Sequence, residues 1–94
     1  MSIETTIFDM LAPLEPGKSI SPEEVARAVD PDGWRRQLGQ VRATAIGLAR
    51  QNRLVITRHG KPANPEKFKG VYRLRLPLDG DVIPPVETDE EDSE

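Results

Sequence analysis

The chain has 94 residues, a formal net charge of −3 and no cysteine. A chain of this length forms one small domain that buries only about 60% of its unfolded surface, and the lack of cysteine excludes disulfides and thiolate metal sites. No apolar run approaches the ~20 residues that cross a bilayer, and "MSIETTIF" lacks the basic and apolar regions of a secretory signal. We therefore expect a soluble, cytoplasmic protein without a membrane partner.

Three helices are predicted in the first half of the chain. The first covers about residues 3–12, with Ser2 as N-cap. Apolar residues recur there at one helical turn: Ile3, Ile7, Leu11 and Leu14. The segment "SPEEVARAV" predicts a second, short helix, with Ser21 as N-cap, proline at the first helical position and Glu24 completing a capping box. "DPDG" repeats the start signal at Asp30 and predicts the longest helix, over about residues 31–52.

The pattern changes period from Leu54 onward. "LVIT" and "VYRLRL" are typical of strands, and "HGKPANPEKFKG" between them, with two glycines and two prolines, predicts a loop. We therefore expect an α+β, mainly α fold: a winged helix–turn–helix of three helices plus a C-terminal β-hairpin wing, over residues 1–76. Residues 77–94 are expected to form an acidic, disordered tail. A three-helix domain with an incidental hairpin is the alternative.

Charge is divided into three blocks along the chain. Residues 1–32 carry a net charge of −5, residues 33–76 carry eleven basic and one acidic side chain for a net +10, and residues 77–94 carry eight acids and no base. A basic block of this strength inside an acidic chain indicates a surface for an anionic partner.

The longest predicted helix has an unusual outer face. At 100° per residue its core face holds Trp34, Leu38, Val41, Ala45, Leu48 and Ala49. The opposite face holds Arg36, Gly39, Gln40, Ala43, Gly47 and Arg50. Two glycines on an exposed helix cost about 1 kcal/mol each relative to alanine, so their presence suggests that a partner approaches the backbone closely. A DNA groove fits this face, and a second protein helix packed on the small residues also fits.

The predicted wing supplies most of the remaining positive charge. Arg73 and Arg75 alternate with the apolar Leu74 and are expected to point outward, and lysines decorate the loop. The candidate nucleic-acid-binding residues are Arg36, Gln40, Ala43, Arg50, Arg58, Lys61, Lys67, Lys69, Arg73 and Arg75. A solvated loop is the alternative for the wing. Arg42 is expected to form a structural ion pair with Glu23 or Glu24 instead, and Arg27 to hold helices together.

Catalytic chemistry is not indicated. "APLEPGKS" resembles a P-loop, but a helix precedes it and two prolines remove the amide donors that a phosphate needs. His59 is the single histidine and lies near the predicted wing, so we expect neither a Ser–His–Asp triad nor a histidine-rich metal site around it. We expect no enzyme, no metal and no small-molecule cofactor.

Several of these segments resemble one bacterial family. "GKSISPEEVARAV", Trp34, "VRATAIGLA", "RLVITRHGKPANP" and "FKGVYRLR" are similar to the family catalogued as domain of unknown function 3253, over about residues 3–76. The resemblance implies a winged-helix domain and no established activity, cofactor or catalytic residue.

The sequence thus favours a DNA-binding winged helix with duplex DNA as partner. The alternative is a protein-interaction module that forms a homodimer or holds an acidic protein through the long helix and the basic wing. The tail adds a further hypothesis: it folds back on the basic face and competes with phosphates, whereas a tail that serves only solubility is the simpler reading.

Overall fold

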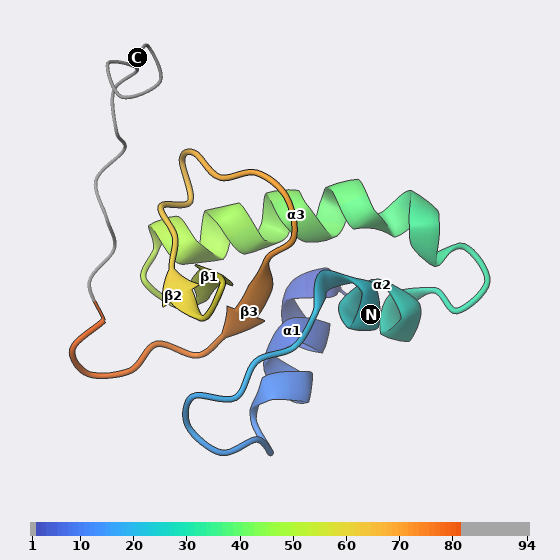
Figure 1. The fold of residues 1–94 in the computed structure, drawn as a ribbon. Coiled ribbons are helices and arrows are strands. Elements are labelled where there is room, and N and C mark those ends of the chain that lie inside the picture. Colours follow the sequence, from blue (N-terminus) through green and yellow to red (C-terminus); the bar gives the residue numbers. More distant parts are fainter. Residues whose placement is uncertain (1, 82–94) are drawn as a thin grey trace, which may run out of the picture.

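The computed structural model describes residues 2–81 and contains three helices and a small sheet (Figure 1). The elements in chain order are α1 (Ile3–Leu11), α2 (Pro22–Val29), α3 (Trp34–Arg50), β1 (Val55–Arg58), β2 (Lys61–Pro62) and β3 (Arg73–Arg75). Figure 1 shows α1 and α2 below α3, and the loop between β2 and β3 rising past its upper side. The fold is α+β, mainly α, and the arrangement is winged-helix-like, as the sequence predicted.

Two of the three helix starts follow the predicted capping chemistry. The Ser2 hydroxyl accepts from the backbone N–H of Thr5 at 3.0 Å. The capping box is complete at α2: Ser21 accepts from the backbone N–H of Glu24 at 3.1 Å, and the Glu24 carboxylate accepts from the N–H of Ser21 at 2.7 Å. Each pair satisfies donors that a helix end leaves open.

The start of α3 differs from the prediction. Asp30 ends α2, and its carboxylate accepts from the backbone N–H of Gly33 at 3.0 Å within a turn over residues 31–33. Gly33 precedes α3 without a side-chain cap, so the helix begins at Trp34, three residues later than "DPDG" indicated. At the other end Asn52 takes a left-handed φ of 63°, and Arg53 N–H reaches Leu48 O, which closes the helix in the Schellman manner.

The core lies between the three helices and one face of the sheet. The largest fully buried side chains are Ile7, Leu11, Leu54, Ile56, Leu74, Val25 and Val41. On α3, Val41, Ala45 and Leu48 are buried and Trp34, Leu38 and Ala49 pack half-buried against them, so the predicted core face is confirmed. Burial of a large aliphatic side chain such as Val41 or Leu48 contributes about 1.5–3 kcal/mol. Burial of this face therefore sets the rotation of α3.

The sheet has three antiparallel strands in the order β2-β1-β3. Strand β1 turns into β2 through His59 and Gly60, whose φ values of 54° and 80° match a type I′ hairpin turn. The prediction of an uninterrupted loop is therefore wrong at residues 61–62, where a proline is tolerated because β2 is an edge strand. A bridge from Ile20 to Leu74, which the sequence analysis missed, ties the α1–α2 connection to the free edge of β3.

Residues 77–81 continue from the sheet. The Asp81 carboxylate accepts from Arg75 at 2.7 and 3.0 Å and from the backbone N–H of Leu78 at 2.6 Å. The predicted acidic tail thus begins with a segment that is fixed to β3. Its remainder, residues 82–94, lies outside the described residues.

Candidate nucleic-acid interface

The outer face of α3 is exposed as the helical pattern predicted. Arg36, Gln40 and Ala43 are exposed, and the Arg36 side chain keeps 79% of its surface in solvent. A Cβ atom built at Gly39 or Gly47 would meet no atom within 4 Å outside the helix backbone. We call these five residues the α3 strip; the surface has little side-chain bulk at Gly39, Ala43 and Gly47.

The loop of residues 63–72, which we call the wing loop, is fastened to the flank of α3. Phe68 is buried and packs edge-on against Tyr72, with ring centroids 5.1 Å apart. Arg42 donates to the Phe68 carbonyl at 3.1 Å and lies 4.1 Å from the centre of its ring. Burial raises the pKa of the Tyr72 phenol, although the nearby Arg42 charge acts in the opposite direction.

Arg42 therefore has a different role from the one predicted. We expected an ion pair with Glu23 or Glu24, yet Glu23 pairs with Arg27 at 2.6 Å and Glu24 caps its own helix. The prediction was wrong because Arg42 points to the wing loop instead of α2. Arg27 does join two helices, since its guanidinium also lies 4.5 Å from the ring centre of Trp34.

A second contact fixes the wing loop near the end of α3. Arg50 donates two hydrogen bonds of 2.6 Å to the Glu66 carboxylate, and this contact raises the pKa of Arg50 above its ordinary value. Glu66 is the single acid of residues 33–76, and it forms an ion pair with Arg50, a residue predicted to contact DNA. Arg50 is exposed but already neutralised, so its main effect is to hold the loop beside the α3 strip.

The two arginines of β3 have different environments. Arg73 is exposed, and it donates to the Ser19 hydroxyl at 2.7 Å and the Ser19 carbonyl at 3.1 Å. Arg75 is only 8% exposed and is paired with Asp81. Arg75 was predicted to point outward, as Arg73 does, but it is not open to solvent, because the segment after the sheet folds back over it.

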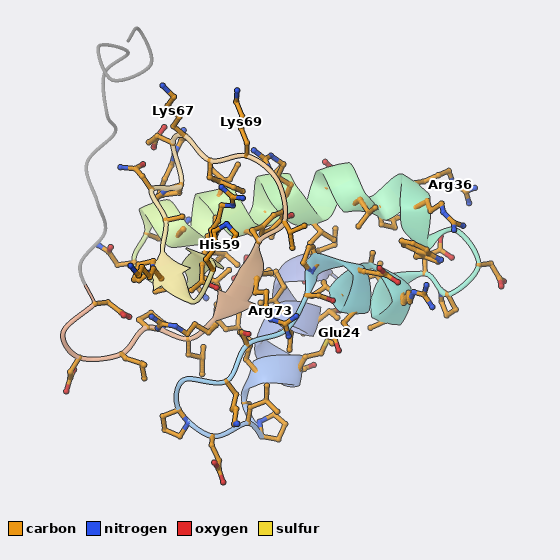
Figure 2. The ribbon with its side chains drawn as sticks, viewed as in Figure 1. Glu24, Arg36, His59, Lys67, Lys69 and Arg73 are labelled. Atoms are coloured by element: carbon orange, nitrogen blue, oxygen red, sulfur yellow. The ribbon has the colours of Figure 1, made fainter. Side chains whose placement is uncertain are left out.

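The remaining candidate cations lie along the hairpin and the wing loop. Figure 2 shows Lys67 and Lys69 projecting away from the loop, and Arg36 near the opposite end of α3. Lys61 is exposed in β2. Half-buried Arg58 donates to the Val71 carbonyl at 3.0 Å, which ties β1 to the wing loop. Among the described residues, Lys61, Lys69, Arg58 and Arg73 form no ion pair.

Sequence reasoning overlooked Arg35. Its guanidinium lies 4.5 Å from the ring centre of Trp34, on which Arg27 also stacks. On the helical wheel Arg35 falls between the two faces, so it was assigned to neither the core face nor the outer face. The neighbouring Trp34 could have indicated its position, because arginine stacks favourably on tryptophan.

The described part of the chain holds no cluster of three His, Asp or Glu side chains suited to a metal ion. No helix between residues 2 and 81 is long and apolar enough to cross a membrane.

Comparison with known proteins identifies a family. The sequence model of the family described as "Protein of unknown function (DUF3253)" matches residues 1–77. No curated protein matches the chain. Since the family match covers all three helices and the sheet, the chain belongs to the DUF3253 family, in agreement with the motifs quoted from its sequence.

Proposed function

We propose that this protein binds duplex DNA, with α3 in the major groove and the wing loop on the phosphate backbone. The observation that carries the proposal is the α3 strip, which is open at both glycines and lies on the helix to which the cationic wing loop is fastened. Binding requires neither catalysis nor a cofactor. Such a role would be exercised in the bacterial cytoplasm.

Each element has a distinct part in this proposal. Gln40 is of the type that reads adenine through two hydrogen bonds, while Arg36 can hold a phosphate or a guanine edge. Gly39 and Gly47 allow the helix backbone to come close to the groove. Lysines 61, 67 and 69 would neutralise phosphates and release counterions.

The contact surface is narrower than the sequence suggested. Arg50 forms an ion pair with Glu66 that holds the wing loop, and Arg75 forms an ion pair with Asp81. We therefore expect neither arginine to contact a phosphate. The proposed surface comprises Arg36, Gln40, Ala43, Arg58, Lys61, Lys67, Lys69 and Arg73.

Fluorescence anisotropy with a labelled random-sequence duplex, titrated across salt, tests the proposal. We expect dissociation constants of about 10⁻⁴–10⁻⁶ M at physiological salt, and a logarithmic salt slope of about −0.9 for each phosphate contacted. Lys69→Gln should reduce that slope by about one contact. Lys18→Gln is the matched control, because it removes the same charge from an exposed position in the α1–α2 connection.

Absence of duplex binding by the wild-type chain at low salt would contradict the proposal. Equal effects of Lys69→Gln and Lys18→Gln would contradict the assignment of the wing loop. In the first case the alternative is a protein-interaction module, which the open space at Gly39 and Gly47 also favours, since it admits a partner helix.

A further inference from the structure

An open apolar groove of about 600 Å³ lies between the start of α2, the first turns of α3 and the end of the wing loop. Its apolar walls are Pro22, Trp34, Leu38, Val71 and Tyr72. Val71 is 83% exposed, more than any other exposed large apolar side chain of residues 2–81. We call this surface the Trp34 groove; an apolar surface left open in this way is typical of a polypeptide-binding site.

The aromatic walls of the groove carry unused hydrogen-bond donors. Neither the Trp34 indole N–H nor the Tyr72 hydroxyl is bonded to another described residue. Neither is a buried atom without a partner, so both can be reached from solvent. Grooves with aromatic walls of this kind bind extended, proline-containing segments, whose carbonyls accept from the aromatic donors.

The rim of the groove is positive. Arg42 and Arg73 line it and Arg35 stacks on Trp34, and none of the three pairs with a described carboxylate. Glu23 also borders the groove, but its charge is matched by Arg27 at 2.6 Å. An occupant with acidic side chains beside its apolar part would therefore be favoured.

The chain itself carries a segment of this chemistry. Residues 82–94 read "VIPPVETDEEDSE", in which an apolar stretch with two prolines precedes six acids. We propose that this segment of a second copy of the chain occupies the Trp34 groove. Its prolines and valines lie on Trp34 and Tyr72, and its acids lie against the arginine rim.

The geometry assigns the segment to a second copy. Asp81 lies beside Ala49 and Asn52 at the C-terminal end of α3. The groove extends from Arg73, two residues before the Arg75 that holds Asp81, to its far wall at Trp34 at the start of α3. These ends of α3 are separated by about 22 Å at 1.5 Å per residue. Residues 82–86 span at most about 17 Å when extended, so a chain's own apolar stretch falls short of the far wall. Reciprocal exchange between two copies closes a symmetric dimer.

Trp34 is the single tryptophan, so its emission reports directly on the groove. A synthetic peptide of residues 82–94, which contains no tryptophan or tyrosine, would be titrated into the dilute full-length chain. We expect a saturable blue shift of the emission, and at least tenfold weaker binding to Val71→Glu. Leu14→Glu is the matched control, because Leu14 is 38% exposed and lies outside the groove. No shift, or equal binding to both variants, would overturn the proposal.

Two further measurements separate the second copy from other occupants. Light scattering should show the mass of the full-length chain rising with concentration toward a dimer, while a full-length Ile83→Ser/Val86→Ser variant stays monomeric. A monomeric wild-type chain whose Trp34 emission responds to the same substitutions would mean that the groove holds its own tail, and would overturn the exchange.

A peptide with its six acids replaced by amides should bind more weakly; equal binding would overturn the role of the rim. None of these readouts depends on DNA binding.

Discussion

Arg73 and Arg75 show how far the environment of one side chain can depart from its sequence pattern. Two residues apart on a strand, they project from the same face of the sheet. Arg73 is exposed and donates a hydrogen bond to Ser19, whereas Arg75 is covered by the segment that ends at Asp81. A buried guanidinium needs a carboxylate and good hydrogen bonds to offset its desolvation, and Asp81 supplies both.

Asp81→Asn is expected to destabilise the fold by about 1–3 kcal/mol at neutral pH, because it leaves Arg75 without a counter-charge. The Arg75 hydrogen bond is the main reason that the pKa of Asp81 is below its ordinary value. The stabilisation is therefore complete above the unfolded-state pKa and is lost as pH falls through the folded-state pKa. Urea denaturation from pH 7 to pH 2 should show the gap between wild type and variant closing below about pH 4. A gap that persists unchanged at pH 2 would exclude this ion pair as its source.

At the scale of the elements, α3 combines a conventional core face with the α3 strip. Gly39 and Gly47 weaken the helix, and nothing in the described fold fills the space beside them. A helix that retains glycine where alanine would fit serves something other than its own stability, which is why the strip is the centre of the proposed interface.

Gly39→Ala and Gly47→Ala should each stabilise the fold by about 0.5–1 kcal/mol. Gly60→Ala is the matched control, because space is equally open there but the φ of 80° in the hairpin turn disfavours an L-residue by about 1–2 kcal/mol. Thermal denaturation should therefore move the melting temperature up for the helix variants and down for the turn variant. If the melting temperature fell in all three variants, the space beside Gly39 and Gly47 would not accommodate an added methyl group.

The elements also show what the sequence could predict. Local chemistry was sufficient for α2, because its capping box lies within four consecutive residues, and for the rotation of α3, because apolar spacing determines it. The start of α3 was predicted three residues too early, because the carboxylate of Asp30 can either cap a helix or close a turn. The partners of Arg42, Arg50 and Arg75 are Phe68, Glu66 and Asp81, and loop conformation decides these pairings rather than periodicity.

At the scale of the whole molecule, positive and negative charge are separated along the chain and between surfaces. The basic block forms α3, the sheet and the wing loop, and residues 82–94 add six acids after Asp81. Those acids compete with phosphates for the same cations if the proposed DNA interface is correct.

A chain ending at Asp81 should therefore bind duplex DNA about tenfold more tightly than the full chain at low salt, and the two affinities should converge as salt rises. The cut belongs after Asp81, since removal of that residue would also leave Arg75 unpaired. Anisotropy on both chains measures the difference. Equal affinities at low salt would mean that the tail does not screen the interface.

The double fastening of the wing loop has a kinetic and entropic consequence. Arg42 and Arg50 grip the loop at Phe68 and Glu66, so it is already ordered beside α3 before any ligand arrives. A loop that must be ordered on binding loses about 0.5–1.5 kcal/mol for each immobilised long side chain. Here the loop backbone is ordered during folding. We therefore expect a partner of this surface to bind without rearrangement of the wing loop.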